Sequence, residues 1–246
     1  MAEALRLGDE ARGRSAPNPN VGCVIVSASG RIVGRGATAA GGRPHAEALA
    51  LQQAGKRAKG AAVYVTLEPC AHDSERGPAC TDLLLAAMPV RVVIALKDPD
   101  PRTTGKGIVQ LRRAGIEVSL GAGREAAKRS LAGWLTRLKL GRPRITLKLA
   151  LSIDGKIALP SGESKWITGE DGRRHVHQER ARSDMILVGR GTYLADQPRL
   201  DVRLPGIEER SPRRALLTRG DAVEGWDESV RPFGYIGAAL GLQGGD

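Results

Sequence analysis

The chain of 246 residues is poor in cysteine and in aromatic residues. It has three Cys, and Phe, Trp and Tyr together make up 3% of it. An odd and small number of cysteines argues against a disulfide framework. Scarce aromatic residues argue against a protein that binds single-stranded nucleic acid by stacking bases on its side chains.

Long apolar segments are missing as well. No run of about 18 apolar residues occurs, which excludes a membrane-spanning helix. The first six residues, MAEALR, alternate acidic and basic side chains and lack the apolar core of a signal peptide. We therefore expect a cytoplasmic protein.

Positive charge is abundant, with 38 Lys and Arg against 27 Asp and Glu, for a net charge of +11. Such a balance suits nucleic acid, a phosphorylated small molecule, or merely a basic proteome. The basic residues are scattered, and no block of five or more like charges occurs. Together with the few aromatic residues, this scatter favours a small phosphorylated substrate over nucleic acid or a membrane.

The most informative pattern joins His45, Glu47, Cys70 and Cys80. One imidazole and two thiolates form a three-ligand set that suits Zn²⁺ and leaves its fourth position open. An open position allows the metal to bind and acidify a water molecule, which Glu47 is close enough to reach. Zinc deaminases of nucleobases carry this H-x-E and P-C signature, so the pattern predicts a catalytic zinc site.

Each part of this pattern also has an ordinary interpretation. A lone His is most often a surface or core residue, and a lone Cys is most often a small buried apolar residue. The main alternative for the whole set is a closed structural zinc site, for which His72 is the nearby candidate for a fourth ligand. The third cysteine, Cys23, lies in an apolar run and is expected to be buried in a strand.

The hydrophobic pattern predicts an α/β chain. Ala- and Leu-rich segments predict helices, and β-branched runs predict strands. In the first half we expect helices at 2–13, 45–54, 81–88, 108–114 and 123–140, and strands at 21–26, 31–36, 62–67, 90–96 and 116–120. We also expect Cys70 in a helix-like turn at 68–70, because free N–H groups at helix N-termini stabilise thiolates.

The segment 141–144 reads as a linker to a second unit. There we expect strands at 145–150, 185–188 and 213–217, a hairpin turn at 153–156 and a helix at 169–182. The Gly189–Thr192 run contains a Gly-x-Gly that phosphate-binding loops share, although a simple turn is favoured. Periodicity fades after Pro205 and is weak beyond 217, and no internal repeat occurs.

Two polar segments are candidates for ligand contact. The amide groups of Asn18 and Asn20 can bind the edge of a heterocycle, or they can simply shape a turn. The loop at 98–107 follows a strand, and open α/β sheets bind ligands at the carboxyl ends of their strands. The alternative for this loop is a plain connection.

Several motifs in the same order resemble the bifunctional deaminase/reductase family of riboflavin biosynthesis. The resemblance runs from about residue 2 to about 217. It is carried by PNPNVG at 17–22, PHAE at 44–47, TLEPC at 66–70, SIDG at 152–155, GESKWIT at 162–168 and LADQP at 194–198.

The resemblance implies a fold and two activities. It implies a cytidine-deaminase-like α/β/α sandwich over 1–142, followed over 143–246 by a partial dihydrofolate-reductase-like α/β domain that is atypical after about 218. The first would deaminate 2,5-diamino-6-ribosylamino-4(3H)-pyrimidinone 5′-phosphate with zinc. The second would reduce the ribosyl side chain to ribityl with NADPH.

The resemblance also assigns residues to roles. Glu47 would be the proton donor. The zinc ligands would be His45, Cys70 and Cys80. The deaminase substrate would contact Asn18, His72 and Arg76. In the second half, cofactor positions match Ala150, Trp166, Thr192 and Asp196, and substrate positions match Ser164, Arg180, Leu200 and Arg203.

The sequence departs from the family in two places. Thr38 stands where many members have a His. Residues 145–246 are about half of what the family's reductase domain needs, and its later strands and Gly-rich cofactor loop have no counterpart. We therefore expect weak or absent reductase activity.

Two other functions remain as alternatives. Transfer-RNA and nucleoside deaminases share the H-A-E and P-C motifs, but they usually space their cysteines as P-C-x-x-C. A zinc-stabilised binding module without activity would also carry the ligands. A homo-oligomer is compatible with each of these alternatives.

Overall fold

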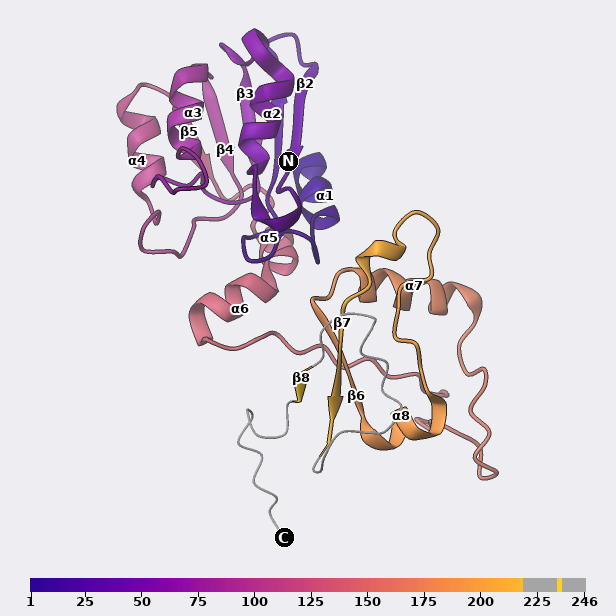
Figure 1. Cartoon of the computed structure of the whole chain (residues 1–246). Helices are drawn as coiled ribbons and strands as arrows, with labels where there is room; N and C mark the ends of the chain where they lie inside the picture. The colour runs from indigo at the N-terminus through magenta and orange to yellow at the C-terminus, as the bar shows by residue number, and fades with distance from the viewer. Residues whose placement is uncertain (219–233, 236–246) are drawn as a thin grey trace. The chain divides into compact units, whose positions relative to one another are not determined.

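The computed structural model describes residues 1–218 and 234–235 and divides the chain into two compact units, 1–146 and 147–246 (Figure 1). Each unit has its own sheet. No helix in the described ranges is both long and apolar enough to cross a bilayer.

The first unit is built on a five-stranded sheet with the order β2-β1-β3-β4-β5. β1 pairs antiparallel with both β2 and β3, whereas β3, β4 and β5 run parallel. The strands span Gly22–Val26 (β1), Ile32–Ala37 (β2), Ala62–Val65 (β3), Arg91–Ile94 (β4) and Glu117–Leu120 (β5). The parallel strands end at one edge of the sheet, where polar loops follow them.

Helices cover both faces of this sheet (Figure 1). α1 lies over Gly22 of β1, whereas α2 lies over Gly34 and Gly36 of β2. α2, α3 and α4 contact one another in succession, and α1 contacts α5. The helices of this unit span Ala2–Glu10 (α1), Ala46–Ala54 (α2), Cys80–Ala87 (α3), Lys106–Arg113 (α4), Arg124–Ser130 (α5) and Ala132–Leu140 (α6).

Close contact between β2 and α2 depends on glycine. A Cβ on Gly36 would lie 2.0 Å from the carbonyl oxygen of Ala46, and one on Gly34 would lie 2.2 Å from that of Ala50. No real Cβ contact is that short, so only glycine permits this packing. The first turn of α2, which follows His45, is thereby seated directly on the sheet.

The core of the first unit forms between the sheet and its helices. Fully buried apolar side chains alternate along the strands, because successive residues of a strand face opposite sides. Core members include Cys23, Ile25, Val63, Val65, Leu84, Val92, Ile94, Leu111 and Leu131. The expectation that Cys23 is a buried strand residue is confirmed, because it is 0% exposed within β1.

The second unit has a three-stranded parallel sheet with the order β6-β7-β8. Its strands span Met185–Gly189 (β6), Arg213–Leu217 (β7) and Gly234–Tyr235 (β8), and its helices span Glu170–Ala181 (α7) and Arg190–Asp196 (α8). Large apolar side chains of this unit remain exposed, among them Leu147, Leu149, Trp166, Met185 and Leu187.

Most predicted elements of the chain are confirmed within one to three residues at their ends. The strand expected at 145–150 is wrong, because no described strand pairs with this segment and it has no regular structure. Its alternating apolar residues Ile145, Leu147 and Leu149 are 77%, 79% and 57% exposed. A strand pattern without a neighbouring strand satisfies neither its backbone groups nor its apolar face.

Two further expectations need correction. The helix expected at 123–140 is two helices that meet at Leu131, which is buried, whereas no residue of α6 is buried. The helix-like turn expected at 68–70 is absent, since the backbone N–H of Glu68 donates to the carbonyl of Leu96 and keeps the chain beside β4.

Candidate metal centre and active site

Three elements bring together His45, Cys70 and Cys80. His45 caps the N-terminus of α2, Cys70 follows β3, and Cys80 is the first residue of α3. Nδ1 of His45 lies 3.2 Å from Sγ of Cys80 and 3.6 Å from Sγ of Cys70. All three ligand atoms lie within 4.8 Å of one another, which confirms that the fold assembles the set.

The donor set fits zinc and leaves room for a further ligand. One imidazole nitrogen and two thiol sulfurs are the donor types that zinc prefers. Within the described residues the group contains only these three side chains. His72, the candidate for a fourth ligand, instead places Nδ1 3.2 Å from Oγ1 of Thr103. The arrangement therefore favours an open site over a closed structural one.

The backbone around the cysteines orients the sulfur atoms. The N–H of Cys80, at the start of α3, donates to Sγ of Cys70 over 3.2 Å. The hydroxyl and the N–H of Thr81 both donate to the carbonyl of Cys70, at 2.7 Å and 3.1 Å. A helix N-terminus thus stabilises both sulfurs, although Cys70 itself is not helical.

The sulfur atoms have unlike acidities. The hydrogen bond from Cys80 is the largest cause that lowers the pKa of Cys70 well below its usual value. The same bond and burial raise the pKa of Cys80 well above its usual value. Burial alone lowers the pKa of His45, but the hydrogen bond to Cys70 and the nearby charge of Glu47 outweigh it, so the pKa rises.

Glu47 lies in the first turn of α2 and is 3% exposed. Burial raises the pKa of its carboxyl group, and the nearby His45 opposes that rise. A carboxyl group whose pKa is raised toward neutrality can both accept and return a proton. Its position beside the ligand set is the one that the sequence predicts for a proton-transfer group.

The two asparagines of the 18–20 turn have different surroundings. Nδ2 of Asn18 donates to the carbonyl of Gly42 at 2.8 Å and lies 3.1 Å from Nε2 of His45. Asn20 is buried, and its Nδ2 donates to the carbonyl of Gly8 and to Oγ of Ser130. Asn18 therefore belongs to the metal site, whereas Asn20 joins α1 to α5.

A cavity of about 320 Å³ opens beside the ligands. His45 and Cys80 line its inner part, and Arg43 and Arg76 also line it. Arg43 donates to Oγ of Ser74, and Arg76 donates to the carbonyl of Gly41. These crossed hydrogen bonds connect the segment before His45 with the loop that precedes Cys80, and their acceptors carry no charge.

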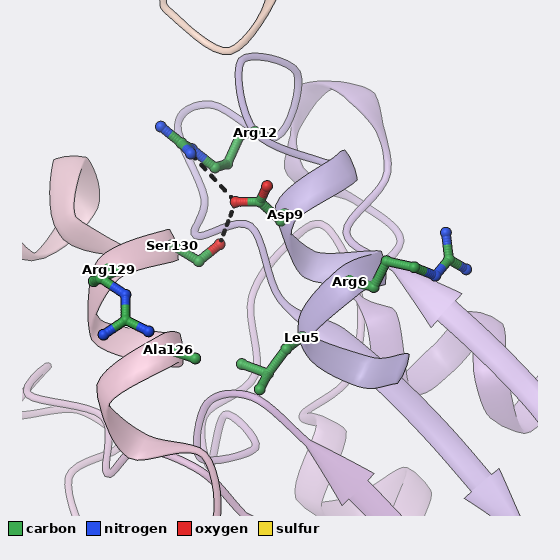
Figure 2. A pocket seen from close by; sticks show the side chains of 7 residues that line it. All are labelled: Leu5, Arg6, Asp9, Arg12, Ala126, Arg129 and Ser130. Carbon is green, nitrogen blue, oxygen red and sulfur yellow. Dashed lines mark hydrogen bonds and ion pairs between the residues drawn. The ribbon is translucent and has the colours of Figure 1, made fainter. Parts of the chain in front are cut away.

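A second hollow, of about 310 Å³, lies between α1 and α5 and has no metal ligand (Figure 2). Asp9 pairs there with Arg12 at 3.2 Å and accepts a hydrogen bond from Ser130 at 3.1 Å. Figure 2 shows the guanidinium of Arg6 pointing away from Asp9 and Ser130. This group pairs with Glu3 and Glu10. These contacts fasten two helices and supply no reacting group.

Thr38, at the position where many family members have His, has a structural role. Its hydroxyl donates to the carbonyl of Pro19 at 2.9 Å and accepts from the N–H of Val21 at 3.0 Å. It is 4% exposed and does not line the cavity beside the ligands. The substrate contact that the resemblance places there has no counterpart in this side chain.

Residues that the sequence analysis did not single out also shape the site. Glu68 is 2% exposed, and its carboxyl group accepts N–H groups of the 98–108 segment. Thr103 is fully buried and contacts His72, and Thr81 holds the carbonyl of Cys70. The TLEPC motif, which contains Glu68, was the only sequence signal for these residues. Composition alone does not distinguish a buried, hydrogen-bonded Glu68 from an exposed acid.

In the second unit the structure connects two of the expected substrate residues. Arg180 donates to the carbonyl of Asp201, and Arg203 pairs with the carboxylate of Asp201 at 2.6 Å. Nε of Arg180 is buried without a hydrogen-bond partner among the described residues. Two guanidinium groups, one with a spare donor, suit a phosphate-bearing ligand.

The remaining expected residues of the second unit lie at different depths. Leu200 is buried, with a φ of 57°, whereas Ser164 is exposed and Ala150 is half-buried. Thr192 and Asp196 are exposed and share one face of α8, and Trp166 is 73% exposed. Arg173 lies 4.6 Å from the centroid of the Trp166 ring, so a stacking surface and a cation occur together.

Two family models match separate parts of the chain, one in each structural unit apart from residues 143–146. The family model for the cytidine and deoxycytidylate deaminase zinc-binding region matches residues 1–96, and that for the RibD C-terminal domain matches 143–225. A solved Thermotoga maritima diaminohydroxyphosphoribosylaminopyrimidine deaminase/5-amino-6-(5-phosphoribosylamino)uracil reductase is 38% identical, with a TM-score of 0.85, and the match covers 96% of this chain and 68% of that one. The chain belongs to the RibD family.

Other RibD proteins support this assignment. The Escherichia coli riboflavin biosynthesis protein RibD is 48% identical over 211 residues, which are 86% of this chain and 57% of that protein. A solved Acinetobacter baumannii RibD is 43% identical with a TM-score of 0.80, covering 91% of this chain and 63% of that one. This chain thus spans about three fifths of the length of these RibD relatives. The expected fold class, a cytidine-deaminase-like unit followed by part of a RibD reductase-like unit, is confirmed.

Proposed function

We propose that the first unit catalyses hydrolytic deamination of 2,5-diamino-6-ribosylamino-4(3H)-pyrimidinone 5′-phosphate, a step of riboflavin biosynthesis. The observation that carries this proposal is the convergence of His45, Cys70 and Cys80, with the buried Glu47 two residues after His45. His45 and Cys80 also line a cavity. Membership in the RibD family supports the substrate, because the Thermotoga maritima relative is named for this pyrimidine.

The metal and the carboxyl group have different roles in this reaction: zinc activates water, and Glu47 transfers protons. When bound by His45, Cys70 and Cys80, zinc makes a water molecule acidic enough to attack near neutral pH. Glu47 takes a proton from the attacking water and delivers it to the ring nitrogen next to the amino-bearing carbon. A second proton from the added hydroxyl group passes through Glu47 to the amino group, the bond from the carbon to that nitrogen breaks, and ammonia leaves. Burial keeps this proton from bulk water, and the raised pKa of Glu47 suits a group that must both accept and donate.

Polar groups around the cavity bind and orient the substrate. The crossed arginines Arg43 and Arg76 have neutral oxygens as their recorded acceptors, so their charges suit the phosphate of the substrate. Asn18, beside His45, and His72, two residues after Cys70, offer hydrogen bonds to the pyrimidine edge. Their assignment as substrate contacts is part of this proposal.

We infer that the second unit contributes part of an NADPH-dependent reductase site, as its match to the RibD C-terminal domain suggests. The exposed indole of Trp166 beside Arg173 fits an aromatic, phosphate-bearing cofactor, with Ala150, Thr192 and Asp196 as further contacts. Arg180 and Arg203 fit the substrate phosphate. The family resemblance adds Ser164 and Leu200 as further substrate contacts. Weak or absent reductase activity stays a prediction. The same holds for a homo-oligomer and for a cytoplasmic location.

Release of ammonia tests the first activity. We expect the purified chain to release ammonia from the pyrimidine phosphate, to lose this activity when a chelator removes zinc, and to regain it when zinc returns. Cytidine and adenosine-containing RNA serve as competing substrates. Ammonia from RNA but not from the pyrimidine phosphate would favour the transfer-RNA deaminase alternative. Zinc retention without ammonia from any substrate would favour a binding module.

A further inference from the structure

Glu68 is a buried carboxyl group that the proposed reaction does not use. It stands two residues before Cys70 and is 2% exposed. Its Oε2 accepts the backbone N–H groups of Asp98 and Gly105, at 3.2 Å and 3.1 Å. Its Oε1 accepts the N–H of Ile108 at 3.3 Å. One side chain thus satisfies three donors from a segment 30 to 40 residues further along the chain.

These bonds give α4 an N-terminal cap from outside the helix. The N-cap residue is Gly105, which has no side chain, and no local side chain caps the helix. The carboxyl group of Glu68 fills that role for the N–H groups of Gly105 and Ile108, and it lies near the positive end of the helix dipole. A Cβ on Gly107 would lie 2.6 Å from the carbonyl of Pro69, so the start of α4 is pressed against the 68–69 backbone.

The loop held in this way reaches the metal site through Thr103. Thr103 is 0% exposed, and its N–H donates to the carbonyl of Asp100 within the loop. Its Oγ1 lies 3.2 Å from Nδ1 of His72. The contacts therefore run from Glu68 to the 98–105 loop, from that loop to Thr103, and from Thr103 to the imidazole of His72, two residues after Cys70.

We propose that Glu68 is a positioning residue: by capping α4 and holding the 98–105 loop, it fixes Thr103 and so sets the orientation of His72 at the pyrimidine site. The expected effect on substrate binding rests on the proposed function, in which His72 contacts the substrate. The effect on the geometry of His72 does not rest on it.

The chain allows a direct test, because it has only four histidines. Imidazole nitrogens labelled with ¹⁵N give one pair of signals for each of His45, His72, His175 and His177, and the zinc-loaded full chain is the sample. In Glu68→Gln one acceptor becomes a donor, so at least one of the three N–H groups loses its partner. We expect the His72 signals to move, those of His175 and His177 in the second unit to stay, and the same His72 shift to occur in Thr103→Val.

Two further variants keep this test decisive. Gly107→Ala keeps the Glu68 side chain but places a Cβ 2.6 Å from the carbonyl oxygen of Pro69 and 3.4 Å from Oε1 of Glu68. It therefore displaces the start of α4, and it is expected to move the His72 signals in the same direction. Glu125→Gln, an exposed acid paired with Lys128, is the matched control and should leave all four histidines in place. Unchanged His72 signals in a folded Glu68→Gln or Gly107→Ala chain would overturn the proposal, whatever the chain's activity.

Kinetics then test the consequence for the substrate. We expect Glu68→Gln and Thr103→Val each to raise KM about tenfold, with a smaller change in kcat and with zinc content unchanged. Since both act on His72 through one route, the double variant should be no worse than the more severe single variant. Effects on KM that multiply in the double variant would overturn the common route. Absence of ammonia release from the wild-type chain would count against the proposed function alone, because the NMR test needs no turnover.

Discussion

The side-chain amide nitrogen of Asn18 lies 3.1 Å from Nε2 of His45, on the opposite side of the imidazole ring from the two thiols. When Nδ1 ligates a metal, Nε2 carries the proton, and ligating imidazoles commonly donate that second N–H to an acceptor that fixes the ring. Asn18 can supply this acceptor when its amide presents Oδ1 to the ring. Asn18→Ala should therefore weaken zinc binding about tenfold or more. Competition with a chromogenic chelator measures this change.

Asn20→Ala is the control for this prediction. Asn20 lies two residues away in the same turn, but its amide bonds to Gly8 and Ser130 instead. Its loss should lower the free energy of unfolding by about 1 kcal/mol and leave zinc affinity unchanged. Equal zinc affinity in the two variants would contradict the role of Asn18 as the support of His45.

Glu47→Gln should abolish most deamination while zinc stays bound. Glutamine keeps the shape of the side chain but cannot take a proton from water, so we expect the rate to fall about 100-fold or more. Ammonia release and metal content, measured on the same sample, check both halves of this statement. Full activity in this variant would show that another group transfers the proton.

Cys80 and Cys23 should respond differently to substitution. Cys80→Ala removes a ligand from the metal set, and we expect zinc content to fall from about one equivalent to near zero. Cys23→Ala removes a buried sulfur from β1, outside the metal set, so it should lower stability by about 1 kcal/mol and keep the metal. Elemental analysis after gel filtration distinguishes the two, and zinc retained by Cys80→Ala would refute the ligand set.

Gly36→Ala should destabilise the first unit by about 3 kcal/mol or more, because the added methyl group meets the backbone of α2. Gly133→Ala, in α6 with no atom within 4 Å of the added Cβ, is the matched control. That change should be neutral or stabilising by up to about 1 kcal/mol, since alanine favours helix. Urea unfolding followed by circular dichroism compares them.

Asp98 should make stability depend on pH. Burial raises the pKa of its carboxyl group to about 6, against about 3.9 in an unfolded chain. The group therefore stabilises the fold fully below about pH 4, and this contribution is lost as pH rises through about 6. Relative to Asp98→Asn, the wild-type chain should lose on the order of 1 kcal/mol between pH 5 and pH 7.5.

Asp100→Asn gives the opposite comparison. The hydrogen bond from Arg102 lowers the pKa of Asp100, so its small contribution is present at neutral pH and declines only in acid. The difference between wild type and Asp100→Asn should therefore be flat from pH 5 to pH 7.5. A flat Asp98 curve in the same urea experiments would contradict the burial of that carboxyl group.

The sequence was most informative where chemistry and local pattern agree. Cys70 and Cys80 are recognisable because few other roles require a thiol after Pro and a second one nearby, and β1, β2 and α2 follow from apolar periodicity. Thr103 and Glu68 were not recognisable, since the partners on which their roles depend lie 30 residues or more away: the imidazole of His72 for Thr103, and backbone N–H groups for Glu68. The strand prediction at 145–150 was wrong because alternating apolar and polar residues form a strand only where a neighbouring strand can pair with them.

The seating of α2 on Gly34 and Gly36 has a consequence for how this site tolerates change. Since peptide groups rather than interlocking side chains set the height of α2 above β2, the height of His45 above this strand is insulated from the volume of nearby aliphatic residues. Trimming Ile25 would shrink the folded fraction of the chain, while His45 would keep its height above β2 in each molecule that remains folded.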